Sequence, residues 1–162
     1  MSTFKRVLAQ VVFVLIVLGL ASSASAQSPD ATATAAKVAQ LLNGTGYTYV
    51  QRTPTVWYIV MNRSSLKDFK LILASSDNLV VIFVTVLKKQ QMQMTPEFML
   101  SELQNNDKFD YVKIGIDKDG DLFVRTDCTP RVMDAQELKS QIDQVAAASN
   151  EVYANAQPFL AK

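Results

Sequence analysis

The pattern of apolar and polar positions divides the chain into an apolar leading segment and a longer part in which helices and short strands are expected. In the leading segment, residues 7–20 contain one polar side chain, Gln10, and no charged one. Beyond residue 46, short runs rich in β-branched and aromatic side chains are typical of strands. Three other stretches place apolar residues three and four positions apart, as one face of a helix does. The pattern therefore predicts an α+β fold.

The predicted strands are separated by short polar turns, which favour an antiparallel sheet because a parallel pair needs a long crossover. Residues 79–87 are apolar except for Thr85, so this strand is expected at the centre of the sheet, with both faces covered or with one face covered by another subunit. Asp119-Gly120 separates two alternating runs, and this dipeptide favours a turn between paired strands. Strands are expected at residues 47–52, 56–61, 69–74, 79–87, 111–116 and 122–126.

A short N-terminal helix, a middle helix and a long C-terminal helix are expected to pack on this sheet. The first spans residues 35–42. The second begins where Thr95 caps the free N–H groups and Pro96 occupies the first turn without losing a hydrogen bond. Four apolar residues of the middle helix are expected to face the core: Phe98, Met99, Leu100 and Leu103.

The third helix starts at Asp134 and carries an apolar stripe over about three heptads. Two interpretations of the stripe stay open, because amphipathicity does not say what covers it. The helix either docks on the sheet or presents a seam to a partner. The candidate partner contacts are Leu138, Ile142, Val145 and Val152 on this helix, with Trp57 and Ile59 on the sheet.

The first 26 residues have the parts of a secretion signal. Lys5 and Arg6 precede the apolar run, and a motif of small residues follows it. The signal peptidase accepts only small side chains three and one positions before the cut, so Ala24 and Ala26 place the cleavage before Gln27. The alternative is an uncleaved membrane anchor, but the apolar run of residues 7–20 is shorter than the roughly 20 residues that span a bilayer as a helix.

Cleavage at this site defines the predicted domain organisation. Residues 1–26 form the signal peptide, residues 27–34 a disordered leader, and residues 35–162 a single domain. The mature protein is expected in the periplasm or outside the cell, without stable membrane insertion. Without Lys5 and Arg6, the 16 basic residues fall to 14 against 15 acidic ones, which gives a net charge of −1. This balance does not favour nucleic acid as a partner.

The composition also argues against most enzyme chemistry and predicts no cofactor. The sequence has no histidine, which removes Ser-His-Asp and Cys-His nucleophile activation and most zinc sites. Cys128 is the only cysteine, so no disulfide can form within one chain. It is interpreted either as a small buried hydrophobic residue or as a reactive or intermolecular thiol.

Three carboxylates gather at the predicted hairpin turn, on Asp117, Asp119 and Asp121. The turn alone accounts for aspartate and glycine at these positions. A weak cation site is the alternative, although the spacing lacks the glycine at position six and the acidic residue at position twelve of an EF-hand loop.

Three segments carry a resemblance to a known family. They are the helix end from Phe98 to Asn106, the hairpin from Tyr111 to Leu122, and the closing helix from Leu138 to Leu160. With the order of elements, they resemble the YbjN-domain family, bacterial proteins described as sensory transduction regulators. The resemblance implies a fold like that of type III secretion chaperones and a role in protein binding, with no active site.

The sequence thus predicts an exported, non-enzymatic module that binds a protein partner or a second copy of itself and acts in regulation. An alternative is a carrier of small ligands or lipids in the cell envelope, with the same apolar strands as pocket walls.

Overall fold

The computed structural model describes residues 29–161, so the predicted signal peptide and its cleavage site lie outside the described residues. Short 3₁₀ turns, η1 to η4, connect or extend the main elements. The helices are α1 (Pro29–Thr45), α2 (Pro96–Asn105) and α3 (Ala135–Ala156), and the strands are β1 (Val50–Thr53), β2 (Val56–Met61), β3 (Phe69–Ser75), β4 (Val80–Leu87), β5 (Lys113–Ile116) and β6 (Leu122–Cys128).

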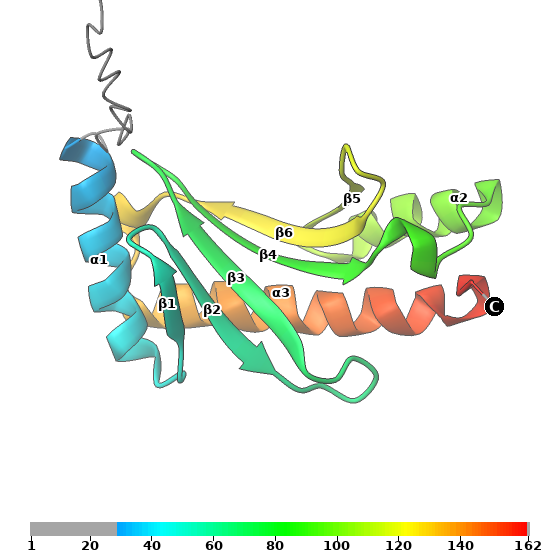
Figure 1. The fold of residues 1–162 in the computed structure, drawn as a ribbon, viewed down its shortest axis with the longest axis horizontal. Coiled ribbons are helices and arrows are strands. Elements are labelled where there is room, and N and C mark those ends of the chain that lie inside the picture. Colours follow the sequence, from blue (N-terminus) through cyan, green and yellow to red (C-terminus); the bar gives the residue numbers. More distant parts are fainter. Residues whose placement is uncertain (1–28, 162) are drawn as a thin grey trace, which may run out of the picture.

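The six strands form one antiparallel sheet in the order β1-β2-β3-β4-β6-β5. The first four strands follow one another as a meander. The chain then passes through α2 and returns as the β5–β6 hairpin, so that β6 pairs with β4 (Figure 1). The prediction of an α+β fold with an antiparallel sheet is confirmed, and β4 is central as its composition indicated.

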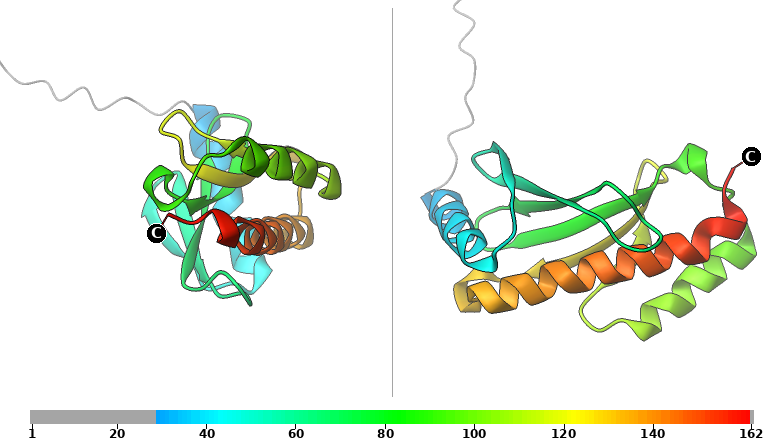
Figure 2. Two further views of the ribbon diagram at one scale, coloured as in Figure 1. Left: turned by 90° about the vertical axis from the view of Figure 1, so that its right-hand side faces the viewer. Right: turned by 90° about the horizontal axis from the view of Figure 1, so that it is seen from below.

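Helix α3 runs along one face of the sheet, and α1 crosses the end of the molecule where α3 begins (Figure 1). Seen along α3, the strands curve partly around it (Figure 2). The core lies between α3 and the strands, and every second side chain of β2, β3, β4 and β6 is buried there. Among the helices that the structure describes, none combines the length and apolar character needed to cross a membrane.

The apolar stripe of α3 is covered by the molecule's own sheet, which decides between its two interpretations. The six residues predicted as partner contacts are all in the core, with side chains no more than 2% exposed: Trp57, Ile59, Leu138, Ile142, Val145 and Val152. They cannot form an accessible surface while the domain is folded. The prediction is therefore corrected, and any partner must dock elsewhere.

Helix α1 begins at Pro29, so the segment predicted as a disordered leader is helical from that residue onward. Ala31 and Ala35 are buried on the same face as Val38 and Leu42. Alanine favours helix and is small enough to let α1 approach its neighbours closely, which explains the earlier start. The helix ends at Thr45 because Gly46 adopts a left-handed conformation, with φ of 79°.

The hairpin predicted around Asp119-Gly120 is present as β5 and β6. Its turn is organised by Asp117, whose Oδ1 accepts hydrogen bonds from the backbone N–H groups of Asp119 and Asp121. Gly120 supplies the positive φ, 87°, that the turn requires. Strand β5 begins at Lys113, later than predicted, because Tyr111 has a left-handed backbone that interrupts the strand.

Candidate functional site

The face of the sheet opposite α3 is the first candidate surface, and we call it the open face. Within residues 29–161 its side chains are half-buried or exposed, in contrast to the fully buried inner face. One row of paired residues crosses it from β1 through β2 and β3 to β4, and this row consists of Val50, Tyr58, Ile72 and Phe83. Val81 on β4 and Phe123 on β6 extend the apolar surface on the same side.

A hollow of about 210 Å³ lies on the open face, between β4 and β6. Phe83 and Phe123 line it, together with Val81, Thr85, Asp117 and Arg125. Ligand pockets for small molecules usually measure about 300–1,000 Å³. A hollow of this size and lining is suited to one large apolar side chain of a docked protein.

The β6 side of the open face carries a compact group of charges. The Asp127 carboxylate accepts hydrogen bonds from Lys113 Nζ at 2.6 Å and from Arg125 Nη2 at 3.2 Å. Partial burial alone would raise the pKa of Asp127, but these bonds and charges outweigh it and hold the pKa below its usual value. Two cations therefore share one carboxylate at this end of the face.

Helix α2 forms the second candidate surface. It begins as predicted, with the Phe98 N–H donating to Thr95 Oγ1 at 3.2 Å. Of the four apolar residues expected to face the core, however, only Phe98 is buried. The outward side of α2 consists of Met99, Leu100 and Leu103, which are 38%, 58% and 66% exposed.

Contacts outside the helix itself set this orientation of α2. The ring of Phe98 packs on Phe159 after α3, with the centroids 5.1 Å apart. Just beyond α2, the side-chain amide of Asn106 donates to the carbonyl of Ile114 and accepts from its N–H, at 3.1 and 2.7 Å. Asn106 thereby pairs with the edge of β5 as a further strand would.

The carboxylates of the hairpin turn are engaged by protein groups. Lys88 Nζ donates to Asp121 at 2.6 Å, and the Lys89 N–H donates to the same carboxylate at 2.9 Å. These bonds hold the pKa of Asp121 below its usual value. Among the described residues, no group of three or more histidine, cysteine or acidic side chains is placed to hold a metal ion.

Cys128 is buried at the end of β6, in agreement with its interpretation as a small hydrophobic residue. Burial raises the pKa of its thiol to about 11. Because the thiolate is the reactive form, this thiol is poorly suited to nucleophilic chemistry.

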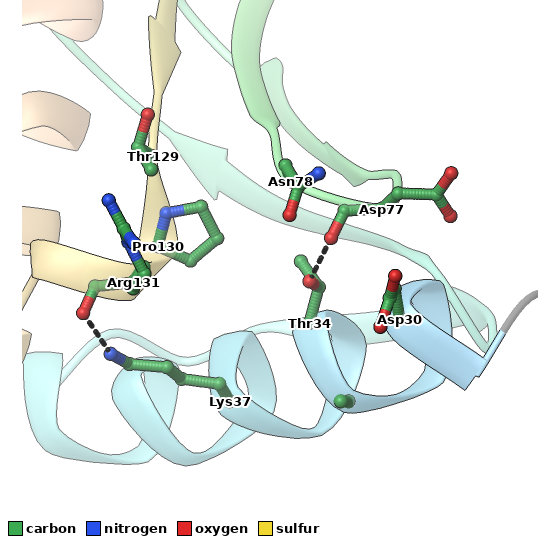
Figure 3. Close-up of a pocket in the computed structure, with 9 residues that line it drawn as sticks. Asp30, Thr34, Lys37, Asp77, Asn78, Thr129, Pro130 and Arg131 are labelled. Atoms are coloured by element: carbon green, nitrogen blue, oxygen red, sulfur yellow. Dashed lines mark hydrogen bonds between the residues drawn. The ribbon is translucent and has the colours of Figure 1, made fainter.

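The hollow in Figure 3, of about 560 Å³, lies between α1, the β3–β4 turn and η3. Thr34 on α1 donates to the carbonyl of Asp77, and Lys37 Nζ donates to the carbonyl of Arg131 at 3.0 Å. These bonds fasten α1 to the sheet and to the start of α3. Acidic and basic side chains both line the hollow.

A second polar network fastens the β2–β3 loop to α3 through Asp143. The carboxylate accepts hydrogen bonds from Tyr47 Oη at 2.5 Å, Arg63 Nη2 at 3.1 Å and Lys139 Nζ at 2.7 Å. Partial burial alone would raise the pKa of Asp143, but its three donors lower it. Burial and the bond to Asp143 raise the pKa of Tyr47.

Replacing Asp143 by asparagine is expected to lower the free energy of unfolding at pH 7 by about 1 kcal/mol, since the carboxylate is partly exposed and screened by solvent. A lowered pKa gives stability that is present above the unfolded value, near 3.8, and lost as the pH falls through the folded value. The difference between wild type and D143N should therefore shrink below about pH 4. Urea unfolding at several pH values measures it, with exposed Asp107→Asn as the control. An equal difference at pH 7 and pH 3 would contradict the assignment.

The fold resembles those of several solved structures, while the sequences share little identity. A chain of the heterodimeric ExoU–SpcU complex from the type III secretion system of Pseudomonas aeruginosa matches with a TM-score of 0.56 and 15% identity, over 74% of this chain and 97% of that one. A chain in the structure of the Yersinia pestis type III secretion chaperone SycH with a fragment of YscM2 matches with a TM-score of 0.54 and 11% identity, over 74% and 98%.

YbjN from E. coli is also similar in structure, with a TM-score of 0.52 and 16% identity, over 78% of this chain and 95% of that one. These matches show a fold of the kind found in YbjN and type III secretion chaperones. No protein-family profile and no curated protein sequence matches this chain.

Proposed function

We propose that this chain is an exported, non-enzymatic protein-binding module with a regulatory role, belonging to the YbjN-domain family. The observation that carries the proposal is the open face. Its apolar row spans four strands, although α3 has already filled the core on the other side. Apolar surface of this kind favours docking of a protein segment.

The proposed occupant of the open face is an apolar segment of a partner protein. The structural neighbours include a secretion chaperone solved with a protein fragment and a heterodimeric complex, which supports a protein as the occupant. The hollow beside Phe83 and Phe123 would accept one of its large side chains. Lys113 and Arg125 at the β6 side would favour an acidic neighbour in the partner.

The outward side of α2 is proposed as a contact between two copies of this chain. Met99, Leu100 and Leu103 form an exposed apolar stripe on one helix. Pairing of the same helix from two copies would bury both stripes in a symmetric interface, which is the commonest kind in homo-oligomers.

The alternative of a small-ligand or lipid carrier finds less support in the structure. The inner side of the sheet is filled by α3, and the hollow on the open face, about 210 Å³, is small for a lipid. The larger hollows, of about 560 and 620 Å³, are lined mainly by charged and polar side chains. Native mass spectrometry showing a bound lipid would revive this alternative.

Export is proposed from residues 1–26, and location in the periplasm or outside the cell follows from it. We propose no stable membrane insertion after cleavage and no nucleic-acid partner. Intact mass of the protein from the extracytoplasmic fraction should correspond to a chain beginning at Gln27. A soluble cytoplasmic product that retains Met1 would overturn this part of the proposal.

Site-specific photocrosslinking in intact cells tests partner binding at the open face. A benzophenone amino acid at Tyr58 should give a discrete crosslinked product, whereas the same group at Ser140, exposed on α3, should not. Adding Phe83→Asp on β4, in the same row across the open face, should remove the Tyr58 product, while the exposed substitution Gln136→Ala should preserve it. Equal crosslinking from both positions, or none from Tyr58, would contradict the proposed surface.

A further inference from the structure

Helix α2 packs against the domain with its more polar side, which is unusual for a surface helix. It buries the polar residues Glu102 and Asn105 beside Phe98 and exposes its leucines. The residues at 98, 102 and 105 follow the helical repeat along one side, and Met99, Leu100 and Leu103 occupy the other. A helix that packs by apolar burial alone would choose the opposite orientation. The buried side of α2 therefore carries polar groups whose interactions need an explanation.

Glu102 is the buried ionisable group on this side of α2. The residue is only 6% exposed, and its Oε2 atom is buried without a hydrogen-bond partner. Its Oε1 atom accepts one long hydrogen bond from Asn105 Nδ2, at 3.4 Å. Burial raises the pKa of the Glu102 carboxyl, and the bond from Asn105 and the charge of Lys108 oppose this only in part.

The charges around α2 do not neutralise Glu102. The elements that pack against it are η2, β5, the C-terminal half of α3 and η4 (Figure 2). The charged groups on them are Asp107 and Lys108, Lys113, and Glu151, and η4 carries none. Lys108 Nζ lies 3.9 Å from Glu151, and Lys113 is paired with Asp127. Within residues 29–161 no ion pair joins a cation to Glu102, so an ionised Glu102 would be buried with little compensation.

We propose that Glu102 is a pH-dependent latch, which holds α2 against β5 and α3 with its leucines outward while the carboxyl is protonated and releases the helix when the carboxyl ionises. Docking that raises the pKa of an acid is most favourable at pH values below the pKa of the unfolded chain, near 4.5. It weakens as the pH rises through the higher pKa of the docked state. Release lets Glu102 reach water. The latch rests on the proposed function in one respect: the outward side of α2 that it presents is the proposed contact between two copies of the chain.

Hydrogen exchange of the α2 backbone amides in the mature protein tests the latch. Protection factors, corrected for intrinsic exchange at each pH, should fall about tenfold in α2 between pH 5 and pH 8, while those of α3 stay constant. Glu102→Gln keeps the size of the side chain without its charge, so α2 in E102Q should stay protected within about twofold over the same range. Glu97→Gln, an exposed position in the first turn of the same helix, should behave as wild type.

Glu102→Met provides a second neutral variant in case the glutamine amide is poorly accommodated. Similar pH profiles of α2 protection in wild type and in both neutral variants would overturn the latch. So would loss of α2 protection at pH 5 in both variants, because a neutral side chain would then be insufficient for docking. The exchange experiment is run at a concentration where the protein is monomeric. Its outcome is therefore independent of partner binding, and crosslinking and sedimentation test the proposed function separately.

Discussion

Replacing Trp57 by alanine is expected to lower the free energy of unfolding by about 3–5 kcal/mol, the usual cost of removing a large buried aromatic side chain. Trp57 has no exposed surface and stands among the largest fully buried side chains of the core. Its removal leaves a cavity in the core behind β2 that the surrounding side chains fill only in part. Urea unfolding followed by far-ultraviolet circular dichroism measures the loss, because the protein's single tryptophan is itself replaced.

Two variants of β2 serve as controls for this prediction. Val60→Ala changes a side chain that is 54% exposed on the same strand and should alter stability by no more than about 0.5 kcal/mol. Trp57→Phe should cost less than the alanine variant, since it keeps a ring and removes an indole N–H that has no hydrogen-bond partner. Unfolding of W57A at the urea concentration of wild type would show that Trp57 is not in the core. Because Trp57 is buried, a loss of partner binding in W57A would be an effect of unfolding and not of a lost contact with the partner.

The parts of the fold that were predictable from sequence are those governed by local interactions. Strand β2 has the predicted bounds, because its β-branched and aromatic run is bordered by Pro54 and by the polar residues after Met61. The start of α2 at Thr95 and the β5–β6 hairpin follow from capping and turn preferences that act within a few residues. The stripe on α3 predicted a helix with one buried side.

What covers each apolar side was not predictable, because that depends on contacts between distant segments. The stripe on α3 fits a sheet or a partner equally well, and only the sheet order places β4 and β6 over it. The orientation of α2 depends on Phe159 and on Ile114, which the sequence does not connect with Phe98 and Asn106. The α1 start was missed because buried alanines resemble a low-complexity leader.

The strands of the open face were predicted as a candidate surface, but its outward-facing residues were not singled out, for a related reason. Its residues alternate with core residues on the same strands, so Tyr58 adjoins Trp57 and Phe83 adjoins Ile82. The sequence signal for such a surface is a strand with apolar side chains on both of its faces, as in residues 79–87. It predicted that β4 is covered on both faces, or on one face by another subunit. The row through Val50, Tyr58, Ile72 and Phe83 exists only once the register of four strands is known.

Replacing both Leu100 and Leu103 by serine is expected to weaken self-association at least about 1,000-fold, from roughly 1–2 kcal/mol for each of the four leucines that the two copies together remove from the interface. Both side chains are more than half exposed in the single chain, so the substitutions should leave the free energy of unfolding of the monomer almost unchanged. Sedimentation velocity over a concentration series measures the dimer dissociation constant. At pH 5 wild type should form a dimer where the double variant is a monomer.

Gln104→Ser is the matched control, because Gln104 is exposed on the same helix and contributes no comparable apolar area. It should leave the dissociation constant within about twofold of wild type. If Glu102 acts as proposed, raising the pH should weaken the wild-type dimer but not that of E102Q, since only the ionisable helix is released. A wild-type protein that stays monomeric at every concentration and pH would remove the contact between copies, whereas a dimer that is insensitive to L100S and L103S would place it on another surface.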